Sequence, residues 1–134
     1  MNPKIITIDG PSGVGKGTIA IMVADYLGYN YLDSGSLYRS LALALSQKNI
    51  DLVKDINDIE KNIFEIDIDF KYEKNGKITV FVNKTDFTKK IRTEKVAKMA
   101  SQIAKNAKAR KMLEVVQRKH IKAPGLVADG RDMG

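Results

Sequence analysis

The residues best suited to chemistry lie near the N-terminus, in the stretch IDGPSGVGKGT at residues 8–18. Four glycines fall within eight positions there, beside Lys16 and Thr18. Glycines cluster where the backbone turns tightly or approaches another molecule closely, because no Cβ atom stands in the way. Two of them, five positions apart with the second directly before the lysine, have the spacing of a phosphate-binding loop. We therefore expect a triphosphate to be held by Gly10, Pro11, Ser12, Gly13, Val14, Gly15, Lys16, Gly17 and Thr18.

The loop departs from the strict motif at one position, which concerns its magnesium ligand. Serine or threonine normally follows the lysine, whereas here Gly17 does and Thr18 comes next. Near the other end of the chain, the apolar run LVAD closes on Asp129, the usual form of the acidic residue that orders Mg²⁺ or its water. Thr18 and Asp129 are therefore our candidate metal ligands. The alternative is a glycine-rich turn that binds nothing.

Two further polar clusters follow expected strands, LDSGSLYR at residues 32–39 and DGRD at residues 129–132. Each supplies an arginine, Arg39 in the first and Arg131 in the second. Ligands of open α/β sheets bind at the carboxyl ends of the strands, and the planar guanidinium group suits a phosphate. These clusters indicate a second, phosphate-bearing substrate beside the loop, although Arg39 taken singly would be typical of a helix surface.

The elements that must position these residues alternate between strands and helices in the first half of the chain. Residues 4–9 predict a short buried strand, and a helix should follow from about residue 15 to 27, ended by Gly28. A second strand, YNYL, stops at Asp33, and another helix begins at Ser36. The inner helix faces should carry Ile19, Val23 and Leu27 in the first helix and Leu37, Leu41 and Ala44 in the second.

The middle of the chain alternates apolar and polar residues with a period of two, which indicates strands. Asn75-Gly76 interrupts the alternation and is a strong hairpin signal, so residues 64–83 should form an antiparallel hairpin. Helices should follow over residues 93–107 and 110–120, and the final run GLVAD predicts a buried strand. The first of these helices should turn inward Val96, Met99, Ala100 and Ile103.

Composition narrows the class of protein. A chain of 134 residues suits one domain, and without cysteine it has neither disulfides nor thiolate metal sites, as expected in the cytoplasm. We expect no membrane segment, because no apolar run is long enough to cross a bilayer. The net charge of +7 comes mostly from lysines spread along the chain rather than gathered in a tract, so nucleic acid is not the expected partner.

Four blocks of the sequence together resemble bacterial cytidylate kinases, and they occur in that family's order: IDGPSGVGKGT, LDSGSLYR, IRTEKVAKMASQIAKNAKARKMLEVVQR and PGLVADGRDMG. The resemblance spans essentially the whole chain. It implies an α/β P-loop NTPase fold, with a parallel core sheet flanked by helices and an inserted antiparallel hairpin that binds the nucleoside monophosphate. Residues 1–60 would then form the P-loop core, residues 61–90 the hairpin insert, and residues 91–134 the base-reading helices and a core strand.

The resemblance also implies a reaction, in which ATP with Mg²⁺ phosphorylates CMP or dCMP and leaves ADP and CDP or dCDP. Ser101 and Arg110 would read the base. Arginine only donates hydrogen bonds, which suits N3 and O2 of cytosine, while a serine hydroxyl can accept from the N4 amino group; uracil reverses this pattern at N3 and position 4. The phosphate and sugar of CMP would be held by Ser34, Arg39, Arg131 and Asp132. The transfer site would contain Lys16, Asp129, Arg131 and Asp132.

The family continues beyond GRDMG through a mobile lid and a closing helix. We therefore expect this chain to be the N-terminal part of such an enzyme, to be inactive or nearly so by itself, and to be a monomer. Two alternatives stay open: another small-molecule P-loop kinase acting on UMP, AMP or shikimate, and a non-catalytic fragment that binds nucleotides or RNA. His120, near a helix end, is expected at the surface without a role.

Overall fold

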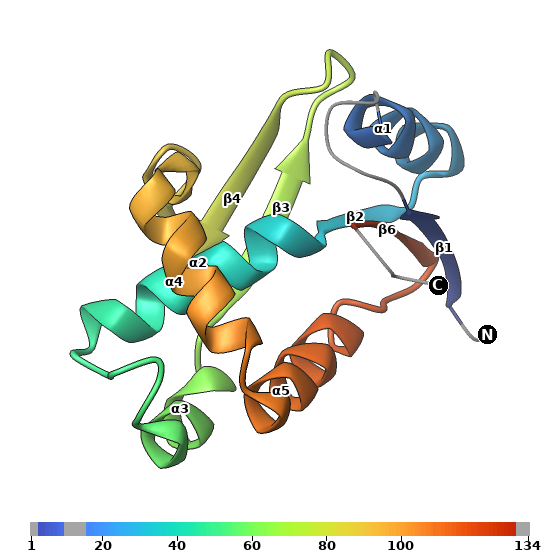
Figure 1. The fold of residues 1–134 in the computed structure, drawn as a ribbon. Coiled ribbons are helices and arrows are strands. Elements are labelled where there is room, and N and C mark those ends of the chain that lie inside the picture. Colours follow the sequence, from blue (N-terminus) through green and yellow to red (C-terminus); the bar gives the residue numbers. More distant parts are fainter. Residues whose placement is uncertain (1–2, 10–15, 131–134) are drawn as a thin grey trace.

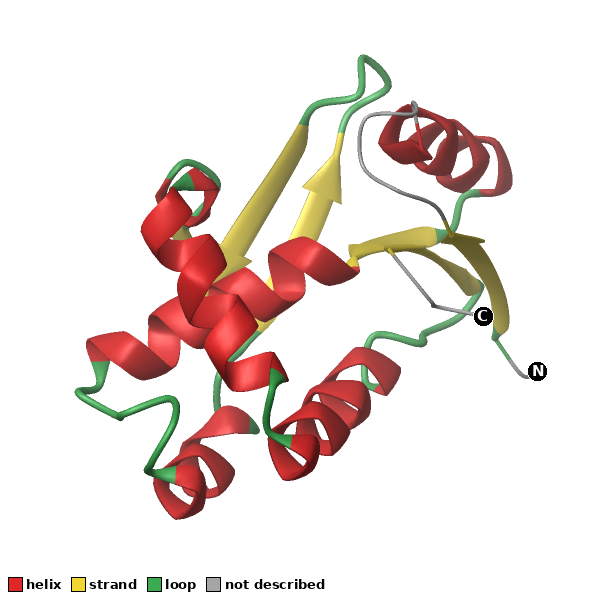
Figure 2. Ribbon diagram, in the orientation of Figure 1, coloured by secondary structure: helices red, strands yellow, loops and turns green. Residues whose placement is uncertain are grey.

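The computed structural model describes residues 3–9 and 16–130, which form a parallel sheet, an antiparallel sheet and the helices around them (Figures 1 and 2). The parallel sheet has the order β1 (Lys4–Asp9), β6 (Gly125–Gly130), β2 (Asn30–Asp33). Helix α1 (Lys16–Leu27) lies on one side of this sheet and α5 (Ala107–Arg118) on the other (Figure 1). The result is an α/β fold in which the last described strand lies between the first two.

β6 is buried along its whole length, as predicted, whereas β1 is more exposed than the sequence predicts. Half of the Ile5 surface is exposed, at 50%, and Ile6 and Ile8 are only half-buried. The predicted strand over residues 4–9 is therefore confirmed, but its predicted burial is wrong. Among the strands that the structure describes, β1 has a neighbouring strand only on the β6 side.

The chain leaves no room for a side chain where β6 begins. A Cβ atom on Gly125 would come within 2.6 Å of the Tyr29 ring and 2.8 Å of the Lys4 carbonyl oxygen. Backbone and ring can approach this closely only because glycine has no Cβ atom. Gly125 thus sets how tightly β6 fits between its neighbours.

Helix α1 has the predicted extent and ends before Gly28, which adopts φ +68°, but its predicted inner face is wrong. Ile19 is 53% exposed and Leu27 is 40% exposed, and of the predicted stripe only Val23 packs partly against the core. The buried residues are instead Ala20, Ile21 and Ala24. Two alanines on the inner face let the helix approach the sheet closely, and this choice of face does not show in the periodicity.

The predicted hairpin is confirmed, and it carries an additional short strand. β3 (Ile68–Tyr72) pairs with β4 (Ile78–Val82), which pairs in turn with β5 (Thr85–Asp86), and both pairings are antiparallel. Gly76 takes φ +91° in the connection between β3 and β4. Such a φ is accessible to glycine at little cost, which is why Asn75-Gly76 predicts the turn.

The remaining helices are α2 (Ser34–Gln47), α3 (Ile56–Ile63) and α4 (Glu94–Ala104), with a short 3₁₀ turn at Lys90–Arg92. α2, α4 and α5 confirm the predicted helices, whereas α3 has no counterpart in the sequence prediction. Two helices, α4 and α5, begin with side-chain caps. Thr93 accepts a hydrogen bond from the Val96 N–H in α4, and Asn106 accepts one from the Ala109 N–H in α5. Such caps satisfy backbone donors that the first helical turn leaves without partners.

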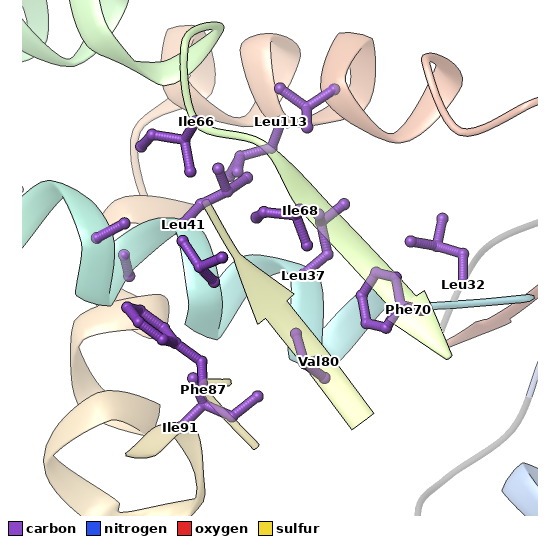
Figure 3. Close-up of a cluster of buried hydrophobic side chains, with 14 of the residues drawn as sticks. Leu32, Leu37, Leu41, Ile66, Ile68, Phe70, Val80, Phe87, Ile91 and Leu113 are labelled. Atoms are coloured by element: carbon purple, nitrogen blue, oxygen red, sulfur yellow. The ribbon is translucent and has the colours of Figure 1, made fainter. Parts of the chain in front are cut away.

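A cluster of buried hydrophobic side chains lies between α2, α5 and the antiparallel sheet (Figure 3). In Figure 3 the two helices and the sheet turn these side chains toward one another, among them Leu37, Leu41, Ile68, Phe70, Val80 and Leu113. In the part of the chain that the structure describes, we find no helix with the length and apolar character required to cross a membrane.

Candidate functional site

Three aspartates meet at one edge of the parallel sheet, because its strands all end there. Asp33 closes β2, Asp9 closes β1, and Asp129 lies one residue before the end of β6. The register places Asp33 opposite Asp129 and Asp9 opposite Gly130. This is the edge at which open α/β sheets bind ligands.

Asp129 is the buried member of this group, with 3% of its surface exposed. Its Oδ2 accepts a hydrogen bond of 3.1 Å from the Tyr31 hydroxyl. The same oxygen would lie 3.6 Å from a Cβ atom on Gly17, in the first turn of α1. The structure therefore brings together two residues that the sequence pairs only by motif, the loop glycine after Lys16 and the aspartate at the end of the last strand.

Tyr31 is a neighbour of Asp129 that sequence reasoning missed. It is 3% exposed, and its pKa is raised well above the usual range for tyrosine, mainly by burial and then by the negative charges of Asp33 and Asp129. The phenol therefore keeps its proton and acts as a hydrogen-bond donor. The only signal in the sequence is the position of Tyr31 two residues before Asp33, which puts both side chains on the same face of β2.

The start of α2 holds the first of the residues expected to bind the acceptor phosphate. Ser34 is half-buried, and its Oγ accepts a hydrogen bond of 2.9 Å from the Gln117 side-chain amide in α5. Asp33, at the N-cap position, accepts a 2.6 Å hydrogen bond from the Ser36 hydroxyl. Since the Ser34 oxygen already accepts from Gln117, its own O–H can donate to a ligand. Gln117 is a second residue that sequence reasoning missed.

The residues predicted to read a base lie on helices rather than at the sheet edge. Ser101 in α4 and Arg110 in α5 are both exposed, and no hydrogen bond joins them among the described residues. Arg110 and Glu114 lie close enough to Tyr38 in α2 to act on its pKa, which burial and Glu114 raise and Arg110 lowers, with a net increase. α2, the helix of Tyr38, also carries Ser34 and the half-buried Arg39.

The antiparallel sheet is attached through its first strand to the amino end of β2, the end opposite Asp33. The Tyr72 hydroxyl donates a 2.9 Å hydrogen bond to the Tyr29 carbonyl oxygen, just before β2. His120 bridges the other end, with Nδ1 3.1 Å from the Val116 carbonyl oxygen and Nε2 2.9 Å from the Ile68 carbonyl oxygen. His120 is half-buried, so its expected surface position is wrong, and its contacts join the end of α5 to β3.

The donor set near Asp129 suits a metal ion that arrives with its own ligands. The described residues contain no group of three or more His, Cys, Asp or Glu side chains able to hold a metal, and Thr18 is exposed in the first turn of α1. Mg²⁺ is commonly bound by one or two protein oxygens together with substrate phosphates and water. One buried carboxylate beside Gly17, in the first turn of α1, fits that pattern.

Several predicted site residues lie outside the described part of the chain. These are Gly10, Pro11, Ser12, Gly13, Val14, Gly15, Arg131 and Asp132. Lys16 is described as the first residue of α1. The predictions for all of these residues therefore stay predictions.

A parallel sheet with a buried aspartate at its carboxyl edge, beside a helix that a glycine-rich loop precedes, defines the class of P-loop α/β kinases. A sequence model of one family in this class, described as cytidylate kinase, matches residues 6–134. The chain belongs to the cytidylate kinase family, and the resemblance seen in the four sequence blocks is thereby confirmed.

Individual relatives agree with this assignment. A cytidylate kinase of Marinomonas sp. (strain MWYL1) is 44% identical over 130 residues, which are 97% of this chain and 57% of the relative. One of Acinetobacter baylyi is 46% identical over 136 residues, with 99% and 59% covered. A cytidylate kinase 2 of Haemophilus influenzae is 45% identical over 130 residues, with 97% and 58% covered. The chain thus spans less than two thirds of the length of these relatives.

Proposed function

We propose that this protein transfers the γ-phosphoryl group of ATP to CMP or dCMP, forming ADP and CDP or dCDP. The observation that carries the proposal is the family match over residues 6–134. It is supported by the buried Asp129 carboxylate beside Gly17, which is the arrangement expected at the phosphate donor. We propose a cytoplasmic monomer.

On the donor side, loop residues 10–18 would bind the triphosphate through backbone N–H groups and the Lys16 ammonium. Mg²⁺ bound with ATP would neutralise charge that builds up on the transferring group. Asp129 and Thr18 would face that ion directly or through water. Little covalent work falls to the protein in such a transfer, which depends on placement and on charge neutralisation.

On the acceptor side, Ser34 would donate its hydroxyl hydrogen to the CMP phosphate, because its oxygen already accepts from Gln117. The other groups proposed for the phosphate and sugar are Arg39, Arg131 and Asp132. Ser101 and Arg110 would hydrogen-bond to the edge of cytosine. The charge of Arg110 acts on Tyr38 in α2, the helix that also carries Ser34 and Arg39, and this supports the proposal.

The test is an acceptor comparison with the complete protein, ATP and Mg²⁺, in which ADP formation is measured with CMP, dCMP, UMP, AMP and shikimate. We expect kcat/KM for CMP to exceed that for UMP by about a hundredfold or more, because uracil leaves site polar groups unpaired. Preference for UMP, AMP or shikimate would assign a different kinase. No transfer to any acceptor, together with RNA binding that falls steeply with salt, would favour the non-catalytic alternative.

The base-reading proposal has its own test. Arg110→Met should raise the KM for CMP about tenfold or more and narrow the preference for CMP over UMP, because two hydrogen bonds from a charged donor are lost. Arg118→Met is the matched control, since Arg118 is an exposed arginine on the same helix. Equal effects of the two substitutions would contradict a role for Arg110 in base recognition.

We also propose that residues 1–134 by themselves turn over CMP slowly or not at all. Coverage of 57–59% of the relatives' lengths supports this proposal. Turnover by these residues alone at the rate of the full-length relatives would overturn it.

A further inference from the structure

One side chain, that of Tyr31, joins the proposed phosphate-donor site to the antiparallel sheet. Its hydroxyl donates to Asp129 Oδ2 at 3.1 Å. Its ring lies edge-on to two aromatic rings of β3, with centroids 6.5 Å from Phe70 and 6.1 Å from Tyr72. Tyr31 therefore contacts a proposed metal-facing carboxylate at one end and the proposed acceptor-binding hairpin at the other.

The carboxylate that Tyr31 contacts is one whose orientation matters. Asp129 is nearly sealed from solvent, so its direction is set by protein groups rather than by water. The hydrogen bond reaches the same Oδ2 that faces Gly17, at the start of the helix that follows the phosphate loop. A change in that hydrogen bond would therefore alter the carboxylate oxygen on the side where the triphosphate is expected.

The position of the phenol is in turn set by β3. Tyr72 anchors this strand through its 2.9 Å hydrogen bond to the Tyr29 carbonyl oxygen, two residues before Tyr31. Edge-on aromatic pairs favour particular geometries beyond simple burial, so the two β3 rings limit where the phenol can lie. If β3 moves away from β2, the Tyr31 ring loses both of these neighbours.

We propose that Tyr31 is a positioning residue for phosphoryl transfer, holding the Asp129 carboxylate in its working orientation and making that orientation depend on the docking of β3. The inference rests on the proposed function. It concerns a residue that acts through Asp129 and does not itself touch the substrates.

Tyr31→Phe in the complete protein keeps the ring and removes only the hydroxyl. We expect kcat to fall about tenfold, the scale of a lost hydrogen bond to a charged group. The Mg²⁺ concentration for half-maximal rate should rise severalfold, while the KM for CMP stays within about twofold of the wild type. Tyr26→Phe is the matched control, because Tyr26 is 89% exposed and should show none of these changes. A Tyr31→Phe protein with unchanged kcat and magnesium response would overturn the inference.

A cycle with Asp129→Asn tests whether Tyr31 acts through Asp129. In the Asn background the carboxylate charge is already gone, so adding Tyr31→Phe should change kcat less than about twofold. The free energy of unfolding in urea gives a readout that does not depend on activity, and there too the effects should be non-additive, as expected for residues in contact. Additive effects in both measurements would contradict the proposal.

Tyr72→Phe tests the dependence on β3. It removes the anchor to Tyr29 without touching Asp129, and we expect a smaller rise, about two- to threefold, in the half-maximal Mg²⁺ concentration. An unchanged magnesium response would remove β3 from the inference. If the wild-type protein transfers no phosphoryl group to CMP, the proposed function fails and the inference fails with it. If the wild-type protein transfers normally and Tyr31→Phe has the same kcat and magnesium response, only the inference is overturned.

Discussion

Among the described residues, Asp129 at the carboxyl edge of the parallel sheet and Ser40 in the core around α2 are both buried polar side chains. They differ in their hydrogen bonds. Asp129 at the sheet edge accepts a hydrogen bond from Tyr31. Ser40 in α2 is fully buried, and its hydroxyl has no hydrogen-bond partner among the described residues. Burial without a partner costs free energy, whereas a well-oriented partner offsets that cost. The buried polar group at the sheet edge thus has a hydrogen-bond partner, whereas the one in the helical core has none within the described part of the chain.

The two regions also differ in how they treat apolar side chains. In β1 and α1, Ile5, Ile19 and Met22 are 50%, 53% and 64% exposed. Between α2, α5 and the antiparallel sheet, Leu37, Leu41 and Leu113 are completely buried. The three fully buried leucines therefore belong to a core separate from the Asp129 carboxylate at the proposed donor site. Substitutions in the two regions should accordingly separate activity from stability.

The largest effect should come from Lys16→Met at the sheet edge. Lys16 is proposed to bind the triphosphate, and its loss should lower kcat about a thousandfold, the scale of a removed transition-state contact. Steady-state ADP formation measures this, with Lys61→Met, an exposed lysine of α3, as the control. Retained turnover would break the assignment of chemistry to this edge.

Leu113→Ala should cost the most stability. Because Leu113 is fully buried, its truncation should lower the free energy of unfolding by about 3 kcal/mol through lost burial and a cavity. Met22→Ala, at a side chain that is 64% exposed, should cost less than about 0.5 kcal/mol. Urea unfolding of both variants gives the comparison directly. Similar losses would mean that the two regions contribute alike to stability.

Gly125→Ala should have an intermediate effect, about 2 kcal/mol of destabilisation, because the new methyl group meets the Tyr29 ring and the Lys4 backbone. Gly35→Ala is the control, since its Cβ atom would be 3.7 Å from its nearest neighbour, Asp33 Oδ1, in ordinary contact. Thermal and urea unfolding measure both. Equal stability of the two variants would show that the strand can shift to admit a side chain.

Ser40→Ala should have the smallest effect, and its sign should be opposite. Removing a buried hydroxyl without a partner should raise the free energy of unfolding by up to about 1 kcal/mol. Ser46→Ala, at a half-buried position later in α2, should not match this gain. A clear loss of stability in Ser40→Ala would show that this hydroxyl is satisfied in solution.

Local signals predicted much of the fold. Asn75-Gly76 predicted the hairpin because its turn geometry depends on adjacent residues only, and Gly28 marked the end of α1 for the same reason. α3 was missed, since it is short and only Ile59 and Ile63 are buried along it. The inner face of α1 was predicted wrongly, because the choice of Ala20 and Ala24 over Ile19 and Leu27 depends on the sheet it meets.

For the candidate site, motif spacing was enough to single out Gly17 and Asp129. It could not identify their supporting residues. Tyr31 and Asp129 are separated by 98 positions, and Ser34 and Gln117 by 83, so neither pair leaves a pattern within any short window. Only the parallel pairing of β2 with β6, and the packing of α5 near α2, brings them into hydrogen-bonding distance.

The sequence by itself determined the hairpin turn, the end of α1 at Gly28, the phosphate-loop motif and the family. These depend on the conformational preferences and spacing of residues that are close along the chain. The tertiary structure alone decided that α1 faces the sheet with its alanines and that the Tyr31 hydroxyl donates a hydrogen bond to Asp129. Those outcomes depend on which segments, far apart in the sequence, pack against each other. The pattern of residues that are neighbours along the chain does not determine this.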